Sequence, residues 1–135
     1  MAKLTVKKFS SADETRPFKA HGHVDLVKIG EGAVGRAVFE AGWKWSSDVK
    51  PIAGTKSCEA SHSGYVLSGR MHIVMDSGEQ ADVGPGDYVV VEPGHDAWTL
   101  GNEACVMLDF AGMEQYARPS REARGEAGAS PPHTH

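Results

Sequence analysis

The chain has few features that would place it in a membrane, in a secretory route or on nucleic acid. No stretch approaches the roughly 18 consecutive apolar residues of a membrane span, and residues 1–8 lack the apolar core of a signal peptide. The formal net charge is −4, and Lys and Arg cluster only near the two ends, where acidic residues dilute them. We therefore expect a cytoplasmic protein that binds neither nucleic acid nor a membrane.

Cysteine is scarce as well. The chain has 2 cysteines, Cys58 and Cys105, and in a reducing compartment we expect both to remain free thiols. The sequence patterns of several common catalytic and phosphate-binding sites are also no clearer here than chance would give. This holds for a Ser-His-Asp order, for a glycine loop that cradles phosphate and for a pair of catalytic carboxylates.

Glycine and proline, by contrast, are abundant, with 16 Gly and 7 Pro among 135 residues. Turn signals recur about every eight to twelve residues, and no long helical period is present. Short runs with β character lie between these turns, at residues 24–29, 35–40, 65–68, 71–75, 80–83, 88–92, 97–100 and 104–110. This pattern is typical of an all-β sandwich or a closed antiparallel barrel.

Composition divides the chain into three parts. Residues 1–22 are polar and aperiodic, which predicts an N-terminal arm. Residues 23–112 hold the β-like runs and predict one barrel domain. Residues 113–135 have too few apolar side chains to offset the entropy of ordering, so we expect a short helix within residues 113–124 and then a loose tail.

The turns of the middle part occur in a recognisable order. They read GYVLSGR at 64–70, DSGE at 76–79, VGPGD at 83–87 and EPG at 92–94. This ordered set resembles the conserved barrel of the cupin superfamily, the RmlC-like jelly roll. The resemblance implies an all-β fold, a single cupin-type antiparallel β-barrel, and it implies a homodimer, because cupins commonly pair through their sheets and terminal strands.

The metal-binding motif of that family is altered here. Cupins often hold a divalent metal through two His and one Glu in a first motif and one His in a second. Counted back from Gly69, the first-motif positions hold Lys56, Cys58 and His62. The His position of the second motif holds Ala97. The usual set of ligands is therefore absent.

Two of these residues and one more offer a different ligand set. Cys58, His62 and His95 are all competent metal ligands. Cys58 and His62 are four residues apart, so they share a face if one strand holds both, and His95 keeps the parity of the usual His position. Such a site would hold one divalent transition metal, Zn, Fe, Mn or Ni. The alternative is a pocket without metal, in which both histidines are hydrogen-bonded and Cys58 packs as a small apolar residue.

The second motif also resembles a narrower group. GHDAW at 94–98, with GWKW at 42–45, is similar to cupins that carry a tryptophan here, among them ureidoglycine aminohydrolase-like and ethanolamine-utilisation-like proteins. This resemblance implies a barrel mouth lined by aromatic groups, and not the reactions of those proteins. We expect the ligand pocket to include Tyr65, Trp43, Trp98 and Asp96.

Two classes of function follow from these residues. In the first, the chain is an enzyme for a small polar molecule, with His62 and His95 as catalytic base, acid or metal ligand. In the second, it binds or senses a small molecule and catalyses nothing; a structural dimer is a third reading. The remaining histidines are expected to lie outside the site: His21, His23, His72, His133 and His135.

Overall fold

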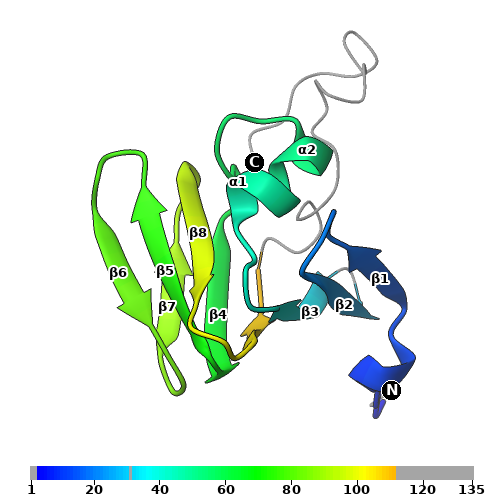
Figure 1. Cartoon of the computed structure of the whole chain (residues 1–135). Coiled ribbons are helices and arrows are strands. Elements are labelled where there is room, and N and C mark those ends of the chain that lie inside the picture. Colours follow the sequence, from blue (N-terminus) through cyan, green and yellow to red (C-terminus); the bar gives the residue numbers. More distant parts are fainter. Residues whose placement is uncertain (1–2, 31, 112–135) are drawn as a thin grey trace, which may run out of the picture.

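The computed structural model describes residues 3–30 and 32–111 of the chain. The helix and tail predicted after residue 112 lie outside this range. Figure 1 shows the elements in space. In chain order they are η1 (Phe9–Ser11), β1 (Glu14–Pro17), β2 (Gly22–Ile29), β3 (Gly32–Phe39), α1 (Trp45–Asp48), α2 (Lys50–Ala53), β4 (His62–Ser68), β5 (Arg70–Met75), β6 (Gln80–Val83), β7 (Tyr88–Val91), β8 (His95–Leu100) and β9 (Cys105–Asp109).

The strands of this described part form two antiparallel sheets. The larger has the order β1-β2-β3-β9-β4-β7, and the smaller has the order β6-β5-β8. Backbone pairing does not close the two sheets into one continuous ladder. Isolated bridges join Cys58 to His95 and Lys44 to Trp98 across the connecting segments. The predicted all-β fold is confirmed, with the shape of a two-sheet jelly roll.

The core lies between the sheets, where alternate residues of each strand meet. Val24 and Leu26 of β2 are fully buried, as is Val66 of β4. Met71 of β5 and Ala97 of β8 cover them from the smaller sheet. Because successive side chains of a strand point to opposite faces, this burial fixes which residues can reach the interior.

Gly69 shows why the corner between β4 and β5 requires glycine. Its φ angle is +75°, and a Cβ atom there would lie 2.2 Å from the carbonyl oxygen of Ala104. Any side chain would therefore meet both backbone strain and a direct clash. The predicted hairpin of β5 and β6 is also present, with Gly78 in its turn at a φ of +100°.

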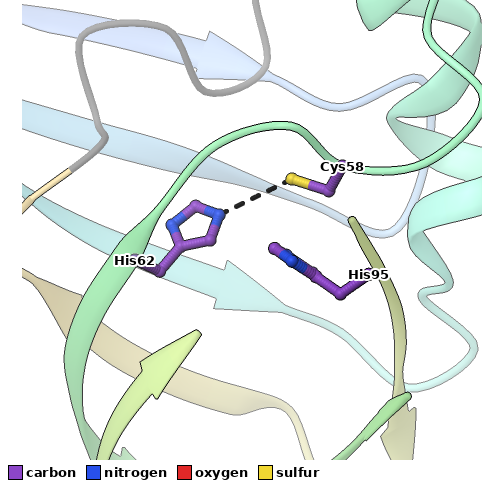
Figure 2. Close-up of side chains that lie close together, drawn as sticks. All are labelled: Cys58, His62 and His95. Carbon is purple, nitrogen blue, oxygen red and sulfur yellow. Dashed lines mark hydrogen bonds between the residues drawn. The ribbon is translucent and has the colours of Figure 1, made fainter. Parts of the chain in front are cut away.

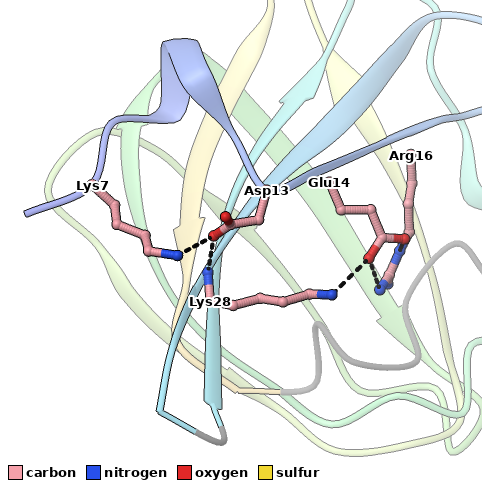
Figure 3. A network of polar contacts seen from close by, with 5 residues as sticks. All are labelled: Lys7, Asp13, Glu14, Arg16 and Lys28. Carbon is pink, nitrogen blue, oxygen red and sulfur yellow. Dashed lines mark hydrogen bonds and ion pairs between the residues drawn. The ribbon is translucent and has the colours of Figure 1, made fainter.

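The N-terminal segment is more ordered than the predicted arm. Residues Glu14–Pro17 form β1, an edge strand paired with β2. Figure 3 shows the polar contacts that hold this segment, among them a 2.8 Å ion pair between Lys7 and Asp13 and a 2.7 Å bond from the Lys28 backbone N–H to Asp13. These two bonds lower the pKa of Asp13. An edge strand held by polar groups leaves no alternating apolar pattern, so the sequence predicted no strand there.

Two short helices, α1 and α2, lie between β3 and β4, which are both strands of the larger sheet. The left-handed Gly54 ends α2. No helix in the described residues has the length and hydrophobicity needed to cross a membrane.

Candidate metal centre

Three potential ligands meet between the two sheets. Figure 2 shows the side chains of Cys58, His62 and His95 converging, each from a different part of the fold. Their potential ligand atoms all lie within 4.8 Å of one another. Among the described residues, these three His and Cys side chains form the group whose potential ligand atoms are close enough to share one metal ion. Cys58 and His95 are buried, with 3% and 5% of their surface exposed.

Backbone pairing places Cys58 beside His95. The Cys58 N–H donates to the His95 carbonyl at 2.8 Å, and the Gly94 N–H donates to the Cys58 carbonyl at 2.7 Å. Cys58 therefore lies in a connecting segment, bridged to the start of β8, and not in one strand with His62. The prediction that these two residues meet is correct, but the assumed shared strand is wrong.

His62, the first residue of β4, is held by a carboxylate. Its Nδ1 lies 2.6 Å from Oδ2 of Asp109, and its Nε2 lies 3.6 Å from Sγ of Cys58. Asp109 ends β9 opposite Gly64, so it reaches His62 diagonally across neighbouring strands. The carboxylate accepts the Nδ1 proton, which directs Nε2 toward Cys58.

His95 is oriented by the backbone. Its Nδ1 lies 2.8 Å from the carbonyl oxygen of Glu92, which can only accept a hydrogen bond. The proton therefore sits on Nδ1, and Nε2 is left with a lone pair whenever the ring is neutral. The rings of His62 and His95 meet edge to face with centroids 5.4 Å apart.

These contacts shift the protonation of the cluster. Burial raises the pKa of the Cys58 thiol, but hydrogen bonds from His62 and His95 outweigh it and lower that pKa to about 6. Burial lowers the pKa of His62, but the bonds with Asp109 and Cys58 outweigh it and raise that pKa to about 9. Burial raises the pKa of Cys105 to about 12. Both cysteines are free, as predicted.

A cavity of about 50 Å³ lies against the two histidines. Asp109 and apolar side chains form its walls, among them Phe39, Trp43, Trp45, Met71, Ile73 and Ala97. Trp43 is 2% exposed, and within the described residues its indole Nε1 is the buried side-chain nitrogen or oxygen that lacks a hydrogen-bond partner. An unsatisfied buried donor costs about 1–3 kcal/mol.

Three of the four predicted pocket residues face elsewhere. Tyr65 is three residues after His62 in β4, so it lies on the opposite face and is 40% exposed. Asp96 and Trp98 alternate with the buried His95 and Ala97 in β8, and they too face outward. Trp98 packs against His72 and lies under the Lys44 ammonium group. Trp43 does line the cavity, together with Trp45.

The other histidines of the described part have partners outside the cluster. His21 lies 3.0 Å from a carboxylate oxygen of Asp48, and His23 lies 3.3 Å from Asp25. His72 contacts Asp82 and Gln80. None of them joins the three-residue cluster, as predicted; His133 and His135 lie outside the described residues.

Comparisons with known proteins identify the family of this part of the chain. The family model described as "Cupin domain" matches residues 53–111, which include Cys58, His62, His95 and Asp109. Residues 53–111 are therefore identified as a cupin domain. No curated protein matches its sequence.

Solved structures show the same cupin fold. An RmlC-like cupin from Shewanella frigidimarina matches with a TM-score of 0.57 at 16% identity, covering 82% of this chain and 92% of that chain. A cupin 2 conserved barrel domain protein from Salinispora arenicola matches with a TM-score of 0.55 at 14% identity, covering 80% and 87%. At these identities the likeness concerns the fold alone.

Asp109 is the member of the site that the sequence did not reveal. It is 47 residues from His62 in the chain, and no motif links the two. The period of β9 puts Cys105, Met107 and Asp109 on one face, which could have signalled a carboxylate directed into an apolar interior. At the family positions, Ala97 lines the cavity and Lys56 is exposed.

Proposed function

We propose that this cupin binds a small molecule at a divalent transition metal held by Cys58, His62 and His95. The observation that carries the proposal is the convergence of three potential ligands within 4.8 Å in a buried place beside a cavity. Cys58 and His62 are four residues apart, and the fold brings His95 beside them through the backbone bridge between Cys58 and His95. Zinc and iron suit this donor set best, because a soft thiolate stands with two imidazoles.

The distances between donor atoms support a tetrahedral centre. Ordinary Zn–S and Zn–N bonds of about 2.3 and 2.0–2.1 Å give a sulfur–nitrogen separation of about 3.5 Å in a tetrahedron. Sγ of Cys58 and Nε2 of His62 are 3.6 Å apart. One ring nitrogen of His95 lies within 4.8 Å of the other two donors, so all three residues can approach one centre.

The groups behind the histidines also support a ligand role. Asp109 accepts from Nδ1 of His62, and the Glu92 carbonyl accepts from Nδ1 of His95. In metal sites such partners fix the tautomer and orientation of the ligating ring. Three protein ligands leave one position for water or substrate, and a metal bound there supplies Lewis-acid chemistry or an activated water. The chain itself contributes two oriented Nε2 atoms, one thiolate and walls that exclude bulk water.

Metal analysis tests this proposal. The chain is prepared without a tag and with His133 and His135 changed to Ala, so that the C-terminal histidines contribute nothing. We expect about one equivalent of Zn or Fe per chain, and its loss in His62→Ala. His23→Ala is the matched control and should keep the metal, since His23 pairs with Asp25 away from the cluster. Metal far below one equivalent, unchanged by His62→Ala, would contradict the proposal.

A second candidate is a binding cupin without metal. It is favoured by the hydrogen bonds that already satisfy the cluster, from His62 to Cys58 and Asp109 and from His95 to Glu92. In this reading the thiolate and imidazolium of Cys58 and His62 form a charged pair under the cavity. The same metal analysis separates the two candidates.

A further inference from the structure

The outer face of the larger sheet is apolar where β7, β4 and β9 lie side by side. Along each strand, side chains that point outward alternate with those that point into the core. Five of the outward side chains, with the residue directly after β9 included, are large, apolar and exposed, and two more are half-buried. We call these seven residues the outer apolar face: Tyr65, Leu67, Tyr88, Val90, Val106, Leu108 and Phe110.

Strand pairing makes this face continuous. Tyr65 of β4 lies opposite Tyr88 of β7 on one side and opposite Leu108 of β9 on the other. The Phe110 N–H donates to the Ser63 carbonyl at 2.8 Å, so Phe110 extends the pairing of β9 with β4 by one residue. Neighbouring strands are about 4.8 Å apart, so these side chains stand in adjacent rows and form one patch.

The composition of this face differs from that of an ordinary solvated sheet, in which outward positions are polar. The smaller sheet follows that rule, because Arg70, His72 and Asp82 occupy outward positions of β5 and β6. In the larger sheet, all outward positions of β4, β7 and β9 are described, and none of them carries a charge. The hydroxyl groups of Ser63 and Tyr88 are hydrogen-bonded to each other. A face of this kind loses little when water leaves it.

The area of the face matches one side of a stable interface. Its five exposed members retain between 40% and 65% of their surface. A fully exposed residue of this size offers roughly 150–250 Å², so together they present roughly 400–600 Å² of mostly apolar surface. An interface of ordinary size buries about 800 Å² on each partner, of which about 56–65% is apolar. The face therefore supplies the apolar area that such an interface needs, and patches of this size often mark an interaction site.

We propose that the outer apolar face binds the same face of a second copy of this chain in a two-fold dimer. A two-fold interface brings each surface patch against itself, so the patch must be compatible with its own copy. A face without charge meets this condition, whereas a face with charges of one sign would repel itself. Two sheets packed in this way lie about 10 Å apart, with the side chains of both faces between them.

This dimer goes beyond the proposed metal centre and does not depend on it. His62 and Asp109 line the cavity from β4 and β9. Tyr65 and Leu108 alternate with the inward side chains and lie on the other side of the same two strands. Substitutions on the outer apolar face should therefore change the association of the chain and leave the metal ligands in place.

Sedimentation equilibrium of the intact chain over a range of concentrations tests the proposal. Val90 lies on edge strand β7 and is 65% exposed, so Val90→Arg places two charges in the two-fold interface. Val6→Arg is the matched control, because Val6 is 75% exposed and precedes Lys7, which pairs with Asp13 directly before β1, the opposite edge strand. Circular dichroism of each variant checks that the fold is kept.

We expect the wild-type chain and Val6→Arg to sediment with twice the mass of one chain at micromolar concentrations. In Val90→Arg, the dissociation constant of the dimer should rise by at least about 100-fold, since the substitution occurs twice in the interface. Sodium chloride at about 0.5 M should not raise the wild-type dissociation constant, because the contact is apolar. A strong rise with salt would show an ionic contact and overturn the proposal.

A measurement on the wild-type chain covers the case in which Val90→Arg does not fold. In a mixture of isotope-labelled and unlabelled chains, filtered nuclear Overhauser spectra detect contacts between two protomers only. We expect such contacts between the rings of Tyr65, Tyr88 and Phe110 and the methyl groups of Leu67 and Val90. Contacts between protomers that lie away from the outer apolar face would overturn the proposal.

Two further outcomes would also overturn it. A wild-type chain that stays monomeric at millimolar concentration would leave the face to another protein or to another part of the same chain. Equal dissociation constants in wild type and folded Val90→Arg would place the interface on another surface. Neither outcome bears on the metal analysis of His62→Ala, so a failure of the dimer and a failure of the metal centre are distinguishable.

Discussion

His62 and Asp109 are joined by a hydrogen bond of 2.6 Å between Nδ1 and Oδ2, across two neighbouring strands and 47 residues of chain. The carboxylate holds the imidazole so that Nε2 faces Cys58 at 3.6 Å. A histidine held in this way is a prepared ligand, because one ring nitrogen is fixed as donor and the other is directed to the site. Both residues line the cavity, and His62 also belongs to the three-residue cluster.

The first prediction concerns this carboxylate. Asp109→Asn keeps the shape of the side chain and removes its charge, so His62 is held less firmly and is less basic. Zinc affinity, measured by competition with a chelator, should fall by about 10- to 100-fold. Asp96→Asn is the matched control, because Asp96 faces outward and accepts from the Ser46 N–H. Equal zinc affinity in wild type and Asp109→Asn would show that Asp109 does not position His62.

The second prediction concerns the corner at Gly69. Gly69→Ala should lower the free energy of unfolding by about 3 kcal/mol, combining the strain of a positive φ with overpacking against Ala104. Gly78→Ala has the same kind of strain but open space around the new Cβ, and should cost only about 1–2 kcal/mol. Urea unfolding of both variants measures the difference. Equal losses would mean that the close approach at Gly69 is unimportant.

The third prediction concerns pH. The hydrogen bond to Asp82 is the main cause that raises the pKa of His72 above its ordinary value. A raised folded-state pKa means that the stabilisation is present below the unfolded value of about 6.5 and is lost as the pH rises through the folded value. Asp82→Asn should therefore move the His72 titration, followed by proton resonance, to lower pH. An unchanged titration would remove Asp82 as the cause.

The fourth prediction follows from the outward position of Trp98. Trp98→Ala should remove the packing with His72 and Lys44 and leave zinc affinity unchanged within twofold, because the ring does not line the cavity. Zinc competition with the variant checks this. A large loss of zinc affinity would show that Trp98 contributes to the site, as the sequence analysis expected.

The sequence carried most of the information on the strands and turns. Alternation predicted the core strands, and Gly69 and Gly78 lie at corners where their backbone angles require glycine. The edge strand Glu14–Pro17 was missed, since it is polar and held by ion pairs. An alternating sequence pattern reveals a strand only when the strand buries apolar side chains, and this strand buries few of them.

The ligand positions of the site were predictable from the resemblance to the cupin motif. His62 and His95 line the cavity. The resemblance to the cupin motif had placed His62 there, and the parity of His95 with the usual His position had placed His95 there. Tyr65, Asp96 and Trp98 were assigned to the pocket from resemblance, although they have the opposite parity. Asp109 depends on the pairing of β4 with β9, which brings together residues that share no local pattern.

X-ray absorption at the zinc edge of the loaded protein tests the central claim most directly. The account predicts one sulfur at about 2.3 Å and two nitrogens of imidazole type at about 2.0–2.1 Å. In Cys58→Ser the sulfur shell should disappear. A spectrum of the wild-type chain with oxygen and nitrogen ligands alone would contradict a metal centre built on Cys58, His62 and His95.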